Sequence, residues 1–267
     1  MGALTLGPLV LSLDRAYAGL GFAVLLLGAE LLARRGRPEL AVWGWQAAVA
    51  AFLAARAGFV LANLDYYLAS PGAIVAIWQG GFASWWGVAA AAVVTLAHAL
   101  RAPTVRSAAP SLGVLALAAW WLPSAVLTPT FDLSGVRLPA LQLETLAGEP
   151  VATAEFGTPA LVNVWATWCP PCRRELPILF DAASATPEVR VLLVNQREGP
   201  DVVREYLASA GFPFDDVVLD RAGALGSALR VAGLPTTFAF DADGRLVDVH
   251  VGEISAPALR ALMAQLR

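Results

Sequence analysis

Four long apolar runs in the first half of the chain constrain its fold most strongly. They cover about residues 12–33, 40–62, 82–100 and 108–128, and few charged residues interrupt them. A helix needs roughly 20 apolar residues to cross about 30 Å of hydrocarbon. The runs therefore predict an α-helical membrane domain of about four transmembrane helices. Four buried helices of a soluble protein are the alternative, and the 58% hydrophobic composition argues against it.

The arginines between these runs predict an orientation. Loops 34–39 and 101–107 contain five arginines, and the other flanks have no comparable cluster. The positive-inside rule places such loops in the cytoplasm, so residues after about 129 are expected outside. No basic residue precedes Asp14, so the first run is not expected to be a cleavable signal peptide. The prediction is a multi-pass protein of a bacterial inner (cytoplasmic) membrane with an extracytoplasmic (periplasmic) second half.

The second half differs from the first in charge. Residues 1–130 contain seven arginines and four acids, whereas residues 131–267 contain 11 arginines and 17 acids. A net charge of −6 in the second half supplies no basic stripe for phosphates, so no nucleic-acid partner is expected.

A polar, proline-containing stretch separates two predicted domains. We expect a transmembrane domain over 1–128, a linker over 129–137 and an α/β domain over 138–267. After the linker, apolar strand-like runs alternate with helix-like segments, and an Asp-Gly turn joins the last two strands. The predicted strands are 160–165, about 190–195, 236–241 and 245–251; the predicted helices are 170–183, 201–211 and 256–266.

The only two cysteines of the chain, Cys169 and Cys172, lie where the first of these strands meets its helix. Unpaired N–H groups and the helix dipole stabilise a thiolate there, so Cys169 is the expected nucleophile and Cys172 the resolving thiol. A structural disulfide across so short a loop would stabilise little. A structural zinc site needs four ligands, and only His250 remains in this domain to join the cysteines. We expect redox chemistry without a metal or another cofactor.

Two motifs give this half a family resemblance. "WATWCPPCRRELP" and "GLPTTFAFDADGRL" resemble the TlpA/ResA-type thiol–disulfide oxidoreductases of the thioredoxin fold. The resemblance implies that Pro235 is cis and faces the cysteine pair, where an extended substrate peptide could bind. The residues expected to contact that substrate are Trp168, Pro170, Pro171, Leu234, Pro235 and Thr236.

An acid near the second cysteine is a further candidate. Thioredoxin has a buried Asp six residues before its first Cys, and this chain has Asn163 there. The TlpA/ResA resemblance instead implicates Glu175, three residues after Cys172, as a catalytic proton acceptor. The alternative is that Glu175 is solvated beside Arg173 and Arg174.

The first half resembles part of prolipoprotein diacylglyceryl transferase. The likeness lies in "LGPLVLSL" (6–13) and "ARAGFVLANLDYYLASPGAIVAIWQGG" (55–81). Where that family has a catalytic His soon after Gly-Gly, this chain reads "GGFASWWG", and the family's second half has no counterpart here. Arg56 in the apolar run needs a partner, either Asp14, Asp65 or a lipid phosphate. Arg56, Tyr66 and Tyr67 are possible lipid-binding residues, but transferase activity is not expected.

Together these features predict an enzyme that reduces disulfides of exported proteins. The membrane half contains no cysteine, so a separate membrane dithiol protein would have to supply the electrons. Two alternatives stay open at this stage: a dithiol oxidase, and a bifunctional or lipid-binding protein that keeps transferase-like lipid binding.

Overall fold

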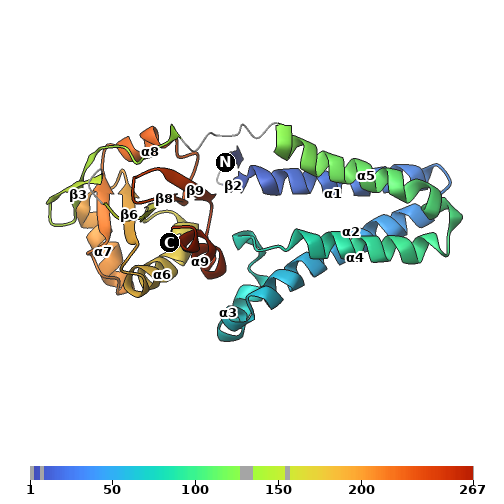
Figure 1. Cartoon of the computed structure of the whole chain (residues 1–267), viewed down its shortest axis with the longest axis horizontal. Helices are drawn as coiled ribbons and strands as arrows, with labels where there is room; N and C mark the ends of the chain where they lie inside the picture. Colours follow the sequence, from blue (N-terminus) through green and yellow to red (C-terminus); the bar gives the residue numbers. More distant parts are fainter. Residues whose placement is uncertain (1–2, 7–8, 127–134, 154–156, 267) are drawn as a thin grey trace. The chain divides into compact units, whose positions relative to one another are not determined.

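The computed structural model describes residues 3–6, 9–126, 135–153 and 157–266. The chain divides into two compact units, Leu13–Pro129 and Met1–Ser12 with Thr130–Arg267 (Figure 1). A short antiparallel hairpin, β1 (Ala3–Leu6) and β2 (Leu9–Ser12), precedes the first helix. Most of the predicted linker, residues 129–137, lies outside the described residues.

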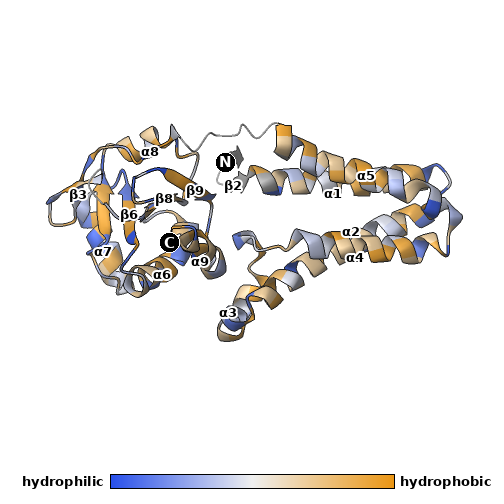
Figure 2. Cartoon of the chain, in the orientation of Figure 1, coloured by the Kyte–Doolittle hydropathy of each residue, from blue (hydrophilic) through white to orange (hydrophobic). Residues whose placement is uncertain are grey.

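The first unit is helical, as predicted. Among the described residues, three helices are long and apolar enough to cross a membrane: α1 (Leu13–Arg34), α2 (Glu39–Ala62) and α5 (Pro103–Val126). The fourth apolar helix, α4 (Ser84–Ala99), has 16 residues and is therefore about 24 Å long. Exposed residues of these helices are largely apolar (Figure 2), which is the pattern expected of helices that face lipid.

Two boundaries of this unit differ from the prediction. Residues 101–107 are not all loop, because α5 begins at Pro103, a residue suited to the first turn of a helix. Residues 63–83 are not a plain connection either. They form a short helix, α3 (Leu64–Ala69), and two 3₁₀ turns, η1 (Pro71–Val75) and η2 (Ile77–Gln79).

Glycines let the membrane helices approach closely. A Cβ added at Gly44 would lie 2.6 Å from the Cβ of Ala29, and one at Gly58 would lie 2.4 Å from Cγ of Trp86. A Cβ at Gly87 would lie 2.8 Å from the carbonyl oxygen of Ala51. Small residues at such contacts are typical of helix packing in membranes, where close van der Waals contact replaces the hydrophobic effect.

The second unit is a seven-stranded mixed sheet in the order β4-β3-β7-β6-β5-β8-β9. Strands β5, β6 and β7 are parallel, and β3 and β8 pair antiparallel to β7 and β5. The edge strands β4 and β9 pair antiparallel to β3 and β8. The strands are β3 (Gln142–Thr145), β4 (Pro150–Ala152), β5 (Ala160–Trp165), β6 (Arg190–Gln196), β7 (Val217–Asp220), β8 (Thr236–Phe240) and β9 (Leu246–Val251). The sequence pattern did not predict β3, β4 and β7.

Alternate residues of the central strands build two cores. Leu161 and Trp165 of β5 join one apolar cluster with residues of α6 (Pro170–Ala185), α7 (Pro200–Ala210) and α9 (Ala256–Ala264). Val162 and Val164 join the other cluster with Leu225 of α8 (Ala224–Ala228). Strand β5 is buried on both faces, so its carboxyl end and the start of α6 are held rigidly where the cysteines lie.

Candidate redox site

The cysteine pair lies at the start of α6. Cys169 is the N-cap residue, and its sulfur accepts a hydrogen bond from the Cys172 N–H at 3.3 Å. The two sulfurs form a disulfide, and the Cα atoms are 5.3 Å apart. In this oxidised state both residues are buried, with Cys169 3% and Cys172 0% exposed. The Cys172 N–H and the positive end of the helix dipole lie at the Cys169 sulfur, which favours a thiolate on that residue after reduction.

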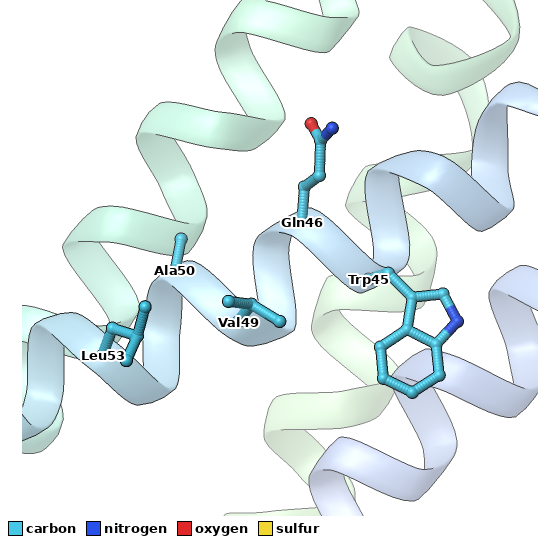
Figure 3. A pocket seen from close by; sticks show the side chains of 5 residues that line it. All are labelled: Trp45, Gln46, Val49, Ala50 and Leu53. Atoms are coloured by element: carbon cyan, nitrogen blue, oxygen red, sulfur yellow. The ribbon is translucent and has the colours of Figure 1, made fainter.

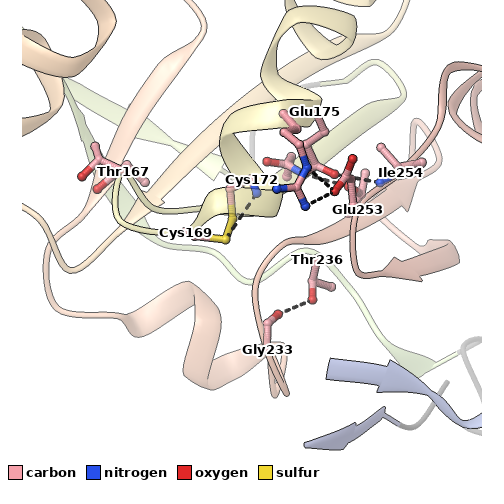
Figure 4. The surroundings of a disulfide bond; sticks show 12 residues. Thr167, Cys169, Cys172, Glu175, Gly233, Thr236, Glu253 and Ile254 are labelled. Atoms are coloured by element: carbon pink, nitrogen blue, oxygen red, sulfur yellow. Dashed lines mark hydrogen bonds and ion pairs between the residues drawn. A yellow bond between two sulfur atoms is a disulfide. The ribbon is translucent and has the colours of Figure 1, made fainter. Parts of the chain in front are cut away.

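Glu175 lies one turn further along α6 and is buried, with 1% of its surface exposed (Figure 4). Its Oε1 accepts from Asn163 Nδ2 at 2.7 Å, and its Oε2 accepts from the Ile254 N–H at 2.8 Å. Burial raises the pKa of this carboxyl from 4.5 to about 8, although both hydrogen bonds lower it. The reading of Glu175 as a solvated residue is wrong, because β5 and the segment after β9 enclose it.

An ion pair flanks this carboxyl. Arg174 donates to Glu253 Oε2 through Nε at 2.9 Å and through Nη2 at 2.5 Å. The Glu253 side chain is 3% exposed and that of Arg174 is 50% exposed, so the pair joins the buried site to the surface. The negative charge of Glu253 raises the pKa of Glu175, and the positive charge of Arg174 lowers it.

The segment before β8 belongs to the surroundings of the disulfide. The Leu234–Pro235 peptide bond is cis, as the resemblance implied. Thr236 is buried, and its hydroxyl donates to the Gly233 carbonyl at 2.7 Å (Figure 4). Of the other residues expected to contact substrate, Trp168 is 69% exposed, Pro170 is exposed, and Pro171 and Leu234 are partly buried.

Glu198 is a site residue that the sequence reading missed. Its carboxylate accepts from the Thr167 N–H at 2.7 Å and from the Thr167 hydroxyl at 2.5 Å. Asn195 at the end of β6 donates to the same carboxylate at 2.7 Å. Glu198 thus ties β6 to the loop that carries Trp168 and Cys169. In the sequence, Asn195 and Glu198 are only two polar residues at and after the end of a strand. Such a pattern is too common to identify the contact.

The membrane unit brings Arg56, Tyr66 and Tyr67 together. The guanidinium lies 5.4 Å from the centre of the Tyr67 ring, and the two tyrosine rings are 5.0 Å apart. Arg56 donates to four backbone carbonyls, those of Ala73, Ile74, Gly80 and Gly81, at 2.7–2.9 Å. These carbonyls, not Asp65, are the partners that a buried guanidinium requires; the Asp14 side chain lies outside the described residues. Arg56 therefore holds the 71–81 segment against α2.

An apolar groove lies elsewhere in this unit. Figure 3 shows it along α2, where Trp45, Gln46, Val49, Ala50 and Leu53 line it. Gln46 is also hydrogen-bonded to His98 at 2.8 Å. None of the three possible lipid-binding residues lines this groove.

Comparison with known proteins separates the same two halves. The Redoxin family model matches residues 133–264, and the prolipoprotein diacylglyceryl transferase model matches residues 11–127. The thiol:disulfide interchange protein HelX of Rhodobacter capsulatus is 35% identical over 126 residues, which are 46% of this chain and 70% of HelX. The thiol:disulfide interchange protein DsbE of Pseudomonas fluorescens is 38% identical over 132 residues, 49% of this chain and 73% of that protein.

A third relative is also named for thiol–disulfide chemistry. The sporulation thiol-disulfide oxidoreductase A of Bacillus subtilis is 28% identical over 123 residues, 44% of this chain and 74% of that protein. The Cys-Pro-Pro-Cys helix start, the buried sheet beneath it and these relatives agree with one another. The chain therefore belongs to the thiol:disulfide interchange proteins, thioredoxin-fold protein-disulfide oxidoreductases, and joins such a domain to a membrane domain that matches prolipoprotein diacylglyceryl transferase.

Proposed function

We propose that this protein reduces disulfides of exported proteins on the extracytoplasmic side of a bacterial inner membrane. The observation that carries the proposal is the buried carboxyl of Glu175, one helical turn from the Cys169–Cys172 disulfide and with its pKa raised to about 8. A group with such a pKa can take a thiol proton and release it again near neutral pH.

The reduced pair would react in two steps. The Cys169 thiolate attacks one sulfur of the substrate disulfide, which forms a mixed disulfide and releases the other substrate sulfur as a thiolate. The Cys172 thiol then passes its proton to Glu175 and attacks the Cys169 sulfur. The second substrate sulfur leaves as a thiolate, and the enzyme is left with the Cys169–Cys172 disulfide. The substrate has gained two electrons, and its two thiolates take protons, one of them from Glu175 by way of solvent.

The surface around the pair suits a peptide substrate. Trp168 and Pro170 are exposed beside Cys169, and the cis Leu234–Pro235 segment belongs to the same surroundings. We assign Trp168, Pro170, Pro171, Leu234, Pro235 and Thr236 to substrate binding. An extended chain bound there would pair with backbone groups and present its disulfide to Cys169.

The membrane domain would anchor the enzyme without reducing it. It contains no cysteine, so the electrons must come from a separate membrane protein with a dithiol of its own. The Arg56 guanidinium donates hydrogen bonds to the carbonyls of Ala73, Ile74, Gly80 and Gly81. His98 is hydrogen-bonded to Gln46. These contacts support an anchoring role in contact with lipid and not diacylglyceryl transfer.

Trapping of substrate tests the roles of the two cysteines. The full chain is expressed with Cys172→Ser or Cys169→Ser, and thiol exchange is stopped with acid, which protonates the thiolates. Mixed disulfides are then separated by non-reducing electrophoresis. Cys172→Ser should accumulate mixed disulfides with exported proteins, because Cys169 can attack but nothing resolves the product. Cys169→Ser should accumulate few. Equal trapping by both variants would contradict the assignment of Cys169 as nucleophile.

The direction of transfer needs a separate measurement. The reduction potential of the pair is expected to be clearly more negative than about −120 mV, the potential of a strong dithiol oxidant. A potential near that value, together with efficient oxidation of a reduced test protein, would make the enzyme a dithiol oxidase.

A further inference from the structure

Asn163, on β5 beneath the cysteine helix, makes hydrogen bonds that the disulfide exchange described above does not use. Its side chain is completely buried. The amide nitrogen Nδ2 donates to Glu175 Oε1 at 2.7 Å and to the Thr237 hydroxyl at 2.9 Å. The amide oxygen Oδ1 has no hydrogen-bond partner among the described residues. An amide with two partners at its nitrogen end and none at its oxygen end is arranged for a charged Glu175.

A protonated Glu175 needs the opposite arrangement. A carboxylate only accepts hydrogen bonds, whereas a protonated carboxyl also donates one. On the Oε2 side the partner is the Ile254 N–H, a backbone donor that cannot become an acceptor. On the Oε1 side the partner is a side-chain amide, which presents an acceptor if it turns over. The other charged groups that act on Glu175 are Glu253 and Arg174, and neither is hydrogen-bonded to it.

We propose that Asn163 is a positioning residue that holds the Glu175 carboxyl in both protonation states by turning its side-chain amide over. When Glu175 takes the Cys172 proton, Oδ1 replaces Nδ2 and accepts from the new O–H. The Thr237 hydroxyl, which can donate as well as accept, then donates to the same Oδ1. The inference rests on the proposed role of Glu175 as the proton acceptor in exchange.

When the Asn163 amide turns over, it exchanges one set of hydrogen bonds to Glu175 and Thr237 for another. In either orientation, the end of the amide that faces Glu175 and Thr237 is fully used and the opposite end is not. Neither state therefore leaves the carboxyl itself unpaired, which would cost about 1–3 kcal/mol for a buried group. An Asp at this position could hold a proton itself but could not donate to both the Glu175 carboxylate and the Thr237 hydroxyl, as Asn163 does. Asn163 instead leaves the proton on Glu175.

The test follows both groups in the full chain in detergent as the pH is changed. Carbon-13 labelling of glutamate carboxyls, with Glu175→Gln for assignment, gives the pKa of Glu175. Nitrogen-15 labelling of asparagine side chains, with Asn163→Asp for assignment, follows the amide. In the parent protein the Asn163 amide signals should change with the same midpoint as the Glu175 carboxyl. Amide signals that stay constant while Glu175 titrates would overturn the proposal.

Two variants separate hydrogen bonding from packing. Asn163→Leu removes a hydrogen bond from both protonation states of Glu175. The bond to the charged carboxylate is the stronger of the two, so the pKa of Glu175 should rise. Thr237→Val removes one hydrogen bond from both orientations of the amide and should leave that pKa almost unchanged, although it lowers the melting temperature. Equal pKa shifts in both variants would assign the effect to packing and overturn the proposal. If Asn163→Leu does not fold, the amide titration of the parent protein decides alone.

These titrations do not depend on turnover. If Glu175→Gln exchanges disulfides as fast as the parent, the proposed role of Glu175 is wrong, yet the coupling between Asn163 and Glu175 is still measured. If exchange needs Glu175 but the amide does not turn, only the inference about Asn163 is wrong.

Discussion

At the residue scale, the chemistry of the site depends on how completely Glu175 is enclosed. The carboxyl contacts Asn163 on β5 and the Ile254 N–H after β9, so two segments far apart in sequence make its environment. Such enclosure penalises the charged form more than two hydrogen bonds compensate, and the pKa rises to about 8. The folded protein therefore binds a proton at Glu175 between about pH 4.5 and 8 that the unfolded chain releases.

This excess proton gives the oxidised protein a defined pH dependence. Because the folded state binds more protons than the unfolded state in this window, stability falls as the pH rises from about 5 to 8, by at most about 1.4 kcal/mol per pH unit. Glu175→Gln stays neutral, so its decline should be smaller over the same window. Denaturation of the full chain in detergent, followed by tryptophan fluorescence, measures both slopes. Identical slopes would mean that Glu175 is charged throughout.

Glu198 supports a second prediction at this scale. Its carboxylate holds the N–H and the hydroxyl of Thr167, two residues before Cys169. Glu198→Ala should loosen the loop that carries Trp168, so we expect a rise in KM for a peptide disulfide larger than any fall in kcat. The pH dependence of exchange should not move, because Glu198 does not contact Glu175. A shifted pH profile would give Glu198 a proton-transfer role.

At the scale of elements, the membrane helices are held by close approach. Helices α2 and α4 meet where Gly58 lies against Trp86 and Gly87 lies against the Ala51 carbonyl. Arg56, two residues before Gly58 on the same helix, holds the 71–81 segment by donating to four of its backbone carbonyls. Gly81 has φ +80° and lies so close to Phe59 and Arg56 that a side chain would collide with them. The Gly-Gly pair thus permits the carbonyl contacts that satisfy Arg56.

Substitution of Gly58 tests this packing. Gly58→Ala should push Trp86 and α4 away, and overpacking of this kind costs typically about 1–3 kcal/mol. Gly113→Ala on α5 is the matched control, because an added Cβ there meets nothing within 4 Å. The melting temperature of the full chain in detergent should fall for Gly58→Ala and stay constant or rise for Gly113→Ala. Equal effects would mean that helix propensity, not contact, decides.

At the scale of the whole molecule, charge supports one orientation. The net charge is +3 over residues 1–130 and −6 over residues 131–267, and Arg34, Arg35, Arg37 and Arg101 lie at the same ends of the helix pairs. By the positive-inside rule this distribution supports the proposed orientation, with the acidic redox domain outside the cell membrane. The cysteines of an enzyme there would exchange with exported proteins and not with the reducing cytoplasm.

A thiol reagent that does not cross membranes tests this orientation. After mild reduction of intact spheroplasts, the reagent should label Cys169 in the Cys172→Ser variant, and lysis should add little further labelling. A cysteine introduced at Arg35, in a redox-inactive background with Cys169→Ser and Cys172→Ser, should show the reverse pattern. Labelling of Cys169 only after lysis would place the redox domain in the cytoplasm.

The sequence by itself determined the features that depend on local pattern. Apolar runs near 20 residues predicted the helical half, although the segment over residues 63–83 was not foreseen. A Cys-x-x-Cys pair between a buried strand and a helix with early prolines predicted the redox site. Strands β3 and β7 were not predicted, because they are four residues long and show little periodicity.

Only the tertiary structure decided which side chains meet across long separations in sequence. Glu175 is 79 residues from Ile254 and Arg56 is 25 residues from Gly81, so no spacing rule could join them. Asn163, 12 residues before Glu175, and Glu198, 31 residues after Thr167, likewise become site residues through the sheet. The physical reason is that burial and hydrogen bonding, which set the proton affinity of a carboxyl, are properties of the packed fold and not of its local sequence.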